Sequence, residues 1–331
     1  MLPLVVVTAG CGKYAEFSLP PLQPQPGAVQ LTWAVRSQPV LGRGAAGDWD
    51  SVDTLNPSLV RIGERYMNFY SGFDGKTWRT GLATSPDGIT WARNGKILSP
   101  EPASWEGSYI AANGAAARQN DMFFYWYQAG DPPQIGLARS PDGLHWNKHA
   151  TPVISRGPRS SWDERGVADP YVITAGPYTY LFYLGQDRAR RQRLGVARSR
   201  NGIQWEKFRG NPILELGEAG TFDEVGLGEP AVWQAQGSYW MLYTGRDRAE
   251  NRRLGLARSQ DGVAWTRVSR SAVLSGAHPW NSKVICDPHV EVAAGETRVW
   301  FGGGNQPRPD ENLNGQIGFA TLKIDIDRLA K

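Results

Sequence analysis

The sequence predicts an all-β fold built from one repeated antiparallel unit, and three observations predict it. A heptapeptide of the form Ser-x-(Asp/Asn)-Gly-x-x-Trp occurs four times, ending at Trp91, Trp146, Trp205 and Trp265. Gly-(Leu/Val)-Ala-x-Ser leads into each copy, and the first glycines of this motif are 55, 59 and 60 residues apart. An aromatic run, such as residues 123–127, precedes each of these glycines. Repeats of this length made of short strands are typical of a propeller.

The Asp-Gly and Asn-Gly pairs predict how the last two strands of each repeat are joined. Both central residues of a type I′ turn need positive φ, which these pairs tolerate. We therefore expect each heptapeptide to form a type I′ hairpin between the third and the fourth strand of its repeat.

A fifth copy of the repeat is split between the two ends of the chain. Residues 299–303 and 316–321 match the aromatic strand and its successor, but the Asp-Gly turn and its tryptophan are missing. Residues 33–41 match the sequence after the other turns, such as residues 146–154. We therefore predict that residues 29–41 are the outer strand of the last blade. The result is a five-bladed β-propeller of four-stranded antiparallel blades, closed by this N-terminal strand, which removes the free sheet edges.

Composition agrees with a single repeat domain over residues 29–331. The chain of 331 residues contains 39 Gly, 23 Pro and 14 Trp, and repeat folds exceed the usual domain size as one unit. No apolar run reaches the roughly 18 residues of a membrane span. The net charge of +4 invites a nucleic-acid interpretation. Lys and Arg are spread over every repeat among Asp and Glu, which argues against such a partner.

Residues 1–28 are predicted to be a leader and tether. The apolar start ends in Thr8-Ala9-Gly10-Cys11 and resembles a truncated bacterial lipoprotein signal, with a lipid anchor on Cys11. Residues 12–27 contain four prolines and would be a Pro-rich tether, or a disordered tail if no signal exists. An anchor would place the protein in the periplasm or at the cell surface, and without it a cytoplasmic location stays open. Cys286 is the only other cysteine, so no disulfide framework is expected.

Candidate site residues recur at one position of the repeat. Each repeat opens with an aromatic residue followed by Asp, Glu or Asn, and in four of them a polar residue before proline follows seven residues later. Proline is tolerated at the start of a strand, so this position marks an inner strand that begins at a channel mouth. The second repeat has Asn-Gly instead. We therefore expect five side chains to converge on one axis: Asn56, Asn113, Asp169, Glu229 and Asp287.

Three of these side chains are acids on consecutive repeats. Capping of strand starts is the structural alternative, and it suits Asn56, Asn113 and the outer acids Asp50, Asp163 and Asp223. Like charges at a channel mouth raise one another's pKa, so we expect Glu229, between two aspartates, to stay protonated near neutral pH. A protonated and an ionised carboxyl at a fixed separation suit acid–base cleavage of a glycosidic bond.

From about residue 29 onward, the chain resembles the glycoside hydrolases of family 43 and their relatives in families 32, 62, 68 and 130. The Asp-Pro and Glu-Pro strand starts, the heptapeptides and the Trp-x-x-x-x-x-Pro-Val-Leu outer strands carry this resemblance. It implies a glycosidase that acts on a plant or microbial arabinoside, xyloside or fructoside and uses no metal or cofactor.

The resemblance also implies roles for the acids. Glu229 in Gly-Glu-Pro matches the general acid, and Asp169 in Ala-Asp-Pro matches the pKa modulator. The base position then falls on Asn113, so we assign the base to Asp287, with Asp53 in reserve. Axial carboxyls on neighbouring blades are expected to lie far enough apart to admit a water molecule, which predicts inversion.

Further residues are candidates for substrate contact. Arg188 and Arg248 lie in twin hairpins and are expected either to pair with Asp187 and Asp247 or to bind sugar hydroxyls or an anionic group. His289 is assigned to the site with Asn56 and Asn113. A stacking platform for sugar rings, or packing inside the blades, is expected of four tryptophans: Trp49, Trp105, Trp162 and Trp280.

Other functional classes fit less well or stay open. A sialidase needs a tyrosine nucleophile and an arginine triad, which the strand starts do not supply. A non-catalytic carbohydrate-binding propeller stays open because two axial positions are Asn. A glycoside phosphorylase stays open because the sequence does not distinguish water from phosphate as the attacking group.

Overall fold

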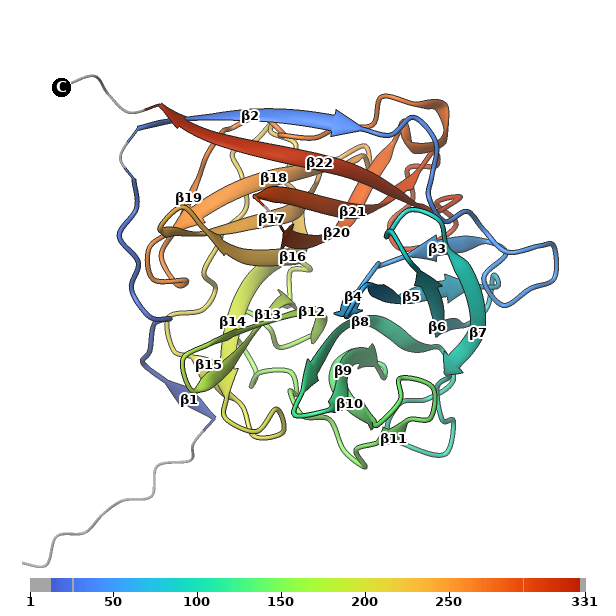
Figure 1. The fold of residues 1–331 in the computed structure, drawn as a ribbon. Helices are drawn as coiled ribbons and strands as arrows, with labels where there is room; N and C mark the ends of the chain where they lie inside the picture. Colours follow the sequence, from blue (N-terminus) through green and yellow to red (C-terminus); the bar gives the residue numbers. More distant parts are fainter. Residues whose placement is uncertain (1–12, 26, 294, 328–331) are drawn as a thin grey trace, which may run out of the picture.

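The computed structural model describes residues 13–25, 27–293 and 295–327, whose regular secondary structure is almost entirely β-strand (Figure 1). Their only helical element is the short 3-10 turn η1 (Pro279–Asn281). No helix within these ranges has the length and hydrophobicity needed to span a bilayer. The lipoprotein signal predicted for residues 1–11 lies outside the described residues.

The strands form successive antiparallel units along the chain. The first unit consists of β3 (Asp53–Leu55), β4 (Leu59–Ile62), β5 (Arg65–Phe73), β6 (Trp78–Ser85) and β7 (Ala92–Leu98), with β3 and β4 both paired to β5. The second consists of β8 (Ile110–Gln119), β9 (Met122–Ala129), β10 (Gln134–Ser140) and β11 (Asn147–Lys148). The third consists of β12 (Gly166–Ala175), β13 (Tyr178–Gln186), β14 (Gln192–Ser199) and β15 (Glu206–Phe208).

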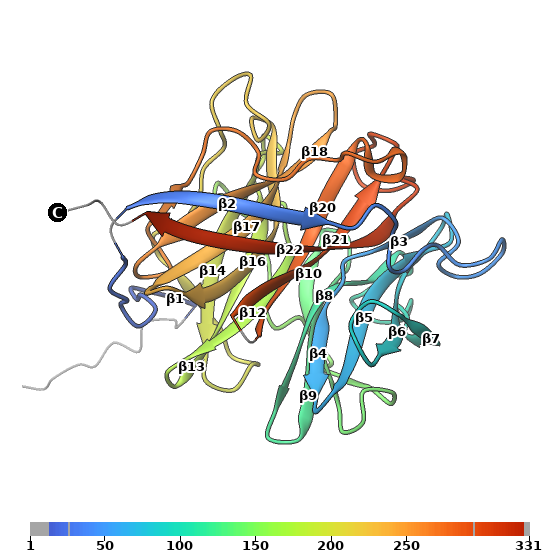
Figure 2. The same ribbon diagram turned by 45° about the horizontal axis from the view of Figure 1, so that its top comes forward.

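The last two units follow the same order. The fourth unit consists of β16 (Gly226–Ala235), β17 (Ser238–Arg246), β18 (Arg252–Ser259) and β19 (Trp265–Arg267). The fifth consists of β20 (Val284–Ala293), β21 (Glu296–Gly304), β22 (Gln316–Asp327) and, from the start of the chain, β2 (Ala28–Val35). The two strands β2 and β22 lie side by side in both views (Figures 1 and 2). Residues 40 and 41 continue this pairing at Ile317, so residues 28–41 run along β22 as expected.

The units are arranged around their inner strands. Each of β8, β12, β16 and β20 contacts the inner strand of a neighbouring unit, and β3 contacts β21 and β22 of the fifth unit. Single parallel pairs also join consecutive units, as between Gln192 and Gly226 and between Arg252 and Val284. This arrangement places the starts of the inner strands on a common face of a β-propeller-like fold.

The heptapeptide turns are held by side chains and are not type I′. The four glycines have φ between 72 and 78°, whereas the Asp or Asn before each is not left-handed. In the first unit the Ser85 hydroxyl accepts from Gly88 N–H at 2.8 Å, and Asp87 Oδ1 accepts from the next two amides at 2.8 and 2.7 Å. The predicted hairpins are therefore present, but the predicted turn type is wrong because the carboxylate supplies the bonds of the turn.

The acids of the opening aromatic–acidic pairs are buried and bonded inside their units. Glu106 is 2% exposed and accepts from Tyr127 and from Lys148, both at 2.5 Å. Asp50 and Asp223 make the equivalent bonds to a tyrosine and an arginine, and Asp163 pairs with Lys207. This confirms the structural interpretation of the outer acids, because each links the segment before the first strand of its unit to the fourth strand, and Asp50, Glu106 and Asp223 also bond a tyrosine of the second strand.

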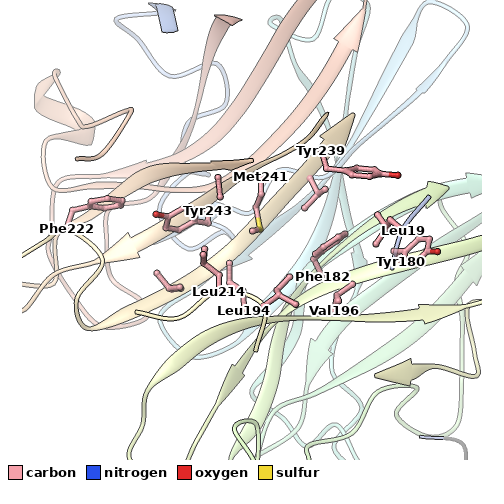
Figure 3. Packing of buried hydrophobic residues seen from close by; sticks show 14 residues of the cluster. Leu19, Tyr180, Phe182, Leu194, Val196, Leu214, Phe222, Tyr239, Met241 and Tyr243 are labelled. Atoms are coloured by element: carbon pink, nitrogen blue, oxygen red, sulfur yellow. The ribbon is translucent and has the colours of Figure 1, made fainter. Parts of the chain in front are cut away.

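Residues 13–25 lie against the third and fourth units instead of extending away as the predicted tether. Strand β1 (Tyr14–Ala15) pairs in parallel with β15, and Leu19 is fully buried. Figure 3 shows Leu19 beside Tyr180 in the apolar cluster between these units. The hydroxyls of Tyr180 and Tyr239 donate to the carbonyl oxygens of Ser18 and Pro20. Pro20 suits this course because it presents its carbonyl to Tyr239 and has no amide N–H that would need a partner.

Candidate active site

The five axial positions share one strained backbone conformation. Their φ values lie between 42 and 50°, the left-handed region, in which non-glycine residues cost free energy and which is found where function constrains the chain. In the second to fifth units the register of the inner strand shifts at this residue, and in the first unit the position separates β3 from β4. A bulge re-aims a side chain, and here it occurs in equivalent places at Asn56, Asn113, Asp169, Glu229 and Asp287.

The structure brings these five side chains together. All of them line one cavity of about 450 Å³ and a narrower one that the neighbouring prolines also line. The predicted convergence of the five positions is therefore confirmed. Three carboxyl groups and two carboxamides thus share one cavity, at the irregular points of the inner strands. The prediction that the neighbouring prolines begin the inner strands is wrong for the third to fifth units, because Pro170, Pro230 and Pro288 lie inside β12, β16 and β20, where the register shifts.

Burial and mutual repulsion shift the titration of two of the acids. Burial, Glu229 and Asp287 raise the pKa of Asp169 well above its ordinary value. Burial and Glu229 raise the pKa of Asp287 to about 7, although hydrogen bonds from Cys286 and Asn56 and the charge of Arg252 oppose the shift. Protons in this cluster are thus held near neutral pH, as acid–base chemistry requires.

Asp287 is the axial acid with the most defined surroundings. Its Oδ2 accepts from Cys286 Sγ at 3.0 Å and from the backbone N–H of Asn56 at 3.4 Å. Gly302 leaves room for this carboxylate, because a Cβ there would lie 2.7 Å from Oδ2. Cys286 is fully buried and its pKa is raised well above the ordinary value by burial and Asp287, so it is a packing and hydrogen-bonding thiol.

Several polar atoms in the cavity have no partner within the described part of the chain. These are Asn113 Oδ1, Glu229 Oε2, Thr244 Oγ1 and Arg246 Nε, all from residues that line the larger cavity. Polar groups that are buried without a partner cost free energy, so their concentration here indicates a site built for a polar ligand. The described residues contain no group of three or more His, Cys, Asp or Glu side chains positioned for a metal ion.

Other predicted site residues lie elsewhere. Asp53 is buried and accepts from the backbone amides of Asn312, Leu313 and Gly315, so it anchors the loop before β22. Its pKa is raised by burial, but it does not line the cavity. His289 lines the narrower cavity, where burial lowers its pKa to about 3 and keeps the ring neutral.

The four tryptophans are packing residues and form no stacking platform at the cavity. The Trp49 ring covers Gly72 and Gly81, and a Cβ on either glycine would lie 2.3 Å from the indole. Trp105, Trp162 and Trp280 lie on glycines of their own units in the same way. The prediction of sugar stacking is wrong because each indole fills the space left by glycines on the second and third strands.

The predicted arginines are also displaced from the cavity. Arg188 is exposed, and Asp187 pairs with Arg191 and Arg193 instead. Arg248 is exposed and pairs with Glu224, whereas Asp247 pairs with Arg253. The cations that line the cavity are Arg246 and Arg252, at the two ends of the same hairpin. The equivalent positions in the third unit hold Gln186 and Gln192, so repetition in the sequence aligns the four residues, but only the strand register shows that they line the cavity.

Known proteins agree with this architecture. The family model for the glycosyl hydrolases family 32 N-terminal domain matches residues 58–273. The uncharacterized protein Rv1502 of Mycobacterium tuberculosis is 27% identical over 232 residues, 64% of this chain and 75% of that protein. A solved glycoside hydrolase matches with a TM-score of 0.70 at 17% identity, over 87% of this chain and 92% of its own.

More distant enzymes share the fold. The GH32 β-fructofuranosidase BmSUC1 of Bombyx mori has a TM-score of 0.62 at 17% identity, over 88% of this chain and 65% of its own. Glycoside hydrolases of families 43 and 117 are similar as well. The chain belongs to the family of the glycosyl hydrolase family 32 N-terminal domain and is a glycoside hydrolase with a β-propeller-like fold.

Proposed function

We propose that the protein hydrolyses a glycosidic bond with inversion, with Glu229 as general acid and an aspartate as general base. The observation that carries this proposal is the meeting of Asp169, Glu229 and Asp287 in one cavity with two raised pKa values. Asp287 is the better base, because a pKa of about 7 leaves a large ionised fraction at neutral pH. Asp169 would then keep its proton and act as the pKa modulator of the site.

The arrangement of the five units supports Glu229 as the acid and Asp287 as the base. We propose that the five units are the blades of a five-bladed propeller, closed by β2 on β22. Glu229 and Asp287 then lie on adjacent blades, both next to the axis. An inverting enzyme needs roughly 6.5–9.5 Å between its carboxyl groups, so that a water molecule fits beside the sugar.

The substrate class is an arabinoside, xyloside or fructoside. A mutant of the Bombyx mori β-fructofuranosidase has been solved in complex with sucrose, which supports testing fructosides first. The mouth of the cavity carries Trp78 and Tyr109 on one side and amide and guanidinium groups on the other, so it offers both an apolar and a polar face. A pyranose or furanose ring presents the same two kinds of surface.

The experiment is a screen of sucrose and the nitrophenyl arabinofuranoside, xyloside and mannoside, with and without inorganic phosphate. Proton NMR of the first-formed anomer accompanies each active substrate. We expect turnover independent of phosphate and an inverted product. Turnover that needs phosphate would identify a phosphorylase, and a retained configuration would refute inversion. Binding without turnover of any glycoside would identify a carbohydrate-binding propeller and refute hydrolysis.

A further inference from the structure

One wall of the larger cavity is a continuous row of residues across the third and fourth units. The register pairs Gln186 with Gln192, Gln192 with Gly226, Gly226 with Arg246, and Arg246 with Arg252. Residues paired across neighbouring strands project from the same face of a sheet. All of them line the cavity. This wall therefore presents two carboxamides, a gap at the glycine, and two guanidinium groups.

The facing wall from the first and second units is chemically different. Trp78 pairs with Ile110 where β6 meets β8, and both line the cavity beside Leu55 and Tyr109. A sugar ring can lay an apolar face on such a wall and direct its substituents across the cavity. The two walls thus fix which side of the ligand faces the guanidinium groups.

Neither guanidinium group forms an ion pair as close as those of the neighbouring hairpin arginines, whose carboxylate partners lie at 2.7–3.1 Å. Arg252 is 8% exposed and donates to the backbone carbonyl oxygens of Arg308 and Pro309 rather than to a carboxylate. Arg246 has Glu250 at 3.4 Å, but its Nε is buried without a hydrogen-bond partner in the described ranges. A Cβ on Gly226 would lie 2.8 Å from Gln192 Oε1 and 3.4 Å from Arg246 Nε. The glycine therefore keeps open the space between amide and cation.

The row lies on the mouth side of the carboxylates. The narrower cavity is lined by the axial residues and their prolines and not by either arginine. A ligand that extends from the axial acids toward the mouth would therefore meet the row with its far side. We propose that Arg246 and Arg252, flanked by Gln186 and Gln192, bind a carboxylate carried by the saccharide, so that the substrate contains an acidic sugar such as a uronic acid. This proposal rests on the glycosidase function above.

A carboxylate fits this row better than a phosphate does. A guanidinium group matches the two oxygens of a carboxylate in a planar, bidentate geometry. The cavity also contains the three axial acids and Asp310, whose charges repel an anion. A singly charged carboxylate meets less repulsion than a phosphate, which carries nearly two charges at neutral pH.

Isothermal titration of the wild-type protein tests the proposal. The probes are D-galacturonate and D-glucuronate, their neutral counterparts D-galactose and D-glucose, and inorganic phosphate. We expect at least one uronate to bind at least tenfold more tightly than its neutral counterpart, with an affinity that falls as salt rises. Equal affinities for both uronates and their neutral counterparts would overturn the proposal, and so would tighter binding of phosphate than of either uronate.

Variants locate the binding. Arg246→Gln should remove the preference for the uronate, whereas Arg248→Gln, an exposed arginine in the same hairpin, should leave it unchanged. Gly226→Ala keeps the charges but fills the gap, and it should weaken uronate binding while the protein stays folded by circular dichroism. Unchanged uronate affinity in both Arg246→Gln and Gly226→Ala would overturn the proposal, as would an equal loss in Arg248→Gln.

The two proposals can fail separately. If no glycoside is cleaved but uronate binding depends on Arg246, the proposed hydrolysis fails and the subsite stands. If neutral glycosides are cleaved and Arg246→Gln changes KM for uronosides no more than for neutral substrates, the hydrolysis stands and the subsite fails.

Discussion

The carboxylate of Asp287 in the fifth unit accepts a hydrogen bond from the backbone N–H of Asn56 in the first unit, at 3.4 Å. The same oxygen accepts from Cys286 Sγ at 3.0 Å. The proposed general base is therefore held between the last and first units of the chain, where β3 also contacts β21 and β22. The proposed closure of the ring and the proposed base thus meet at this junction, and each can be tested.

The protonation of Asp287 should be visible in both activity and stability. Because its pKa is raised to about 7, kcat/KM should rise with pH through that value as the base loses its proton. The folded protein binds this proton more tightly than the unfolded chain, so the free energy of unfolding should fall as pH rises from about 4 to about 7. Asp287→Asn should lower kcat about 10²–10⁴-fold and yet raise Tm at pH 8. The difference in Tm between Asp287→Asn and the wild type should be larger at pH 8 than at pH 4. The same difference at both pH values would contradict the assignment of Asp287 as a buried acid with a raised pKa.

Cys286 should tune this titration. Its thiol donates to Asp287 and opposes the rise in the carboxyl pKa. Cys286→Ala should therefore move the acidic limb of the pH–kcat/KM profile to higher pH, and Cys286→Ser, which keeps a donor, should move it less. A limb at the same pH in all three proteins would show that the thiol does not act on the base.

Gly302 should be required for the position of the base. A methyl group there would lie 2.7 Å from Asp287 Oδ2 and 2.9 Å from Cys286 Sγ, so the carboxylate must shift. Gly302→Ala should lower kcat at least tenfold while circular dichroism stays native. Gly42→Ala is the matched control, because its methyl group meets only the end of the Gln316 side chain at 3.3 Å. Equal activity of the two variants would show that the carboxylate does not need the space beside Gly302.

The acids of the aromatic–acidic pairs, such as Glu106, should carry stability rather than catalysis. Lys148→Met leaves Glu106, which is 2% exposed, without its cation and should cost about 3–5 kcal/mol of unfolding free energy. Arg270→Met removes an exposed pair with Glu218 and should cost less than about 1 kcal/mol. Denaturant unfolding measures both. Similar losses of unfolding free energy in the two variants would show that the buried ion pair stabilises the fold no more than an exposed one.

Two parts of the N-terminal segment, Leu19 and β2, should each stabilise the fold. Leu19→Ala should cost about 2–5 kcal/mol, because the side chain is fully buried between the third and fourth units. Deleting residues 1–41 should cost more than deleting residues 1–27, because it also removes β2 from β22. Equal melting temperatures for the two truncations would contradict closure by β2.

Much of this arrangement could be predicted from the sequence, because it recurs. The repeat spacing located every unit, and the residue before each recurring proline located Asp169, Glu229 and Asp287, although these prolines lie inside their strands and not at the starts. The pairing of β2 with β22 was predictable because residues 33–41 carry the outer-strand motif that the fifth repeat lacks. Repetition also made the outer acids recognisable as structural.

Long-range packing was not predictable in the same way. Trp49 and its equivalents looked available to a sugar because their partner glycines lie on other strands, 20 or more residues away. Arg246 and Arg252 were missed because only the register, which places them opposite one another and beside Gly226, turns them into the cavity. Leu19 gave no periodic signal, because a single buried residue in a Pro-rich segment has none.

Leaving-group dependence in Glu229→Gln tests the central claim most directly. Two glycosides of the same sugar are compared, one with a nitrophenolate leaving group and one with an unactivated alcohol. Loss of the general acid should lower kcat for the unactivated substrate by about 10²–10⁴-fold, lower it far less for the nitrophenyl substrate, and leave binding unchanged. Equal losses for both substrates, or full activity on the unactivated one, would contradict the assignment of Glu229 as the acid.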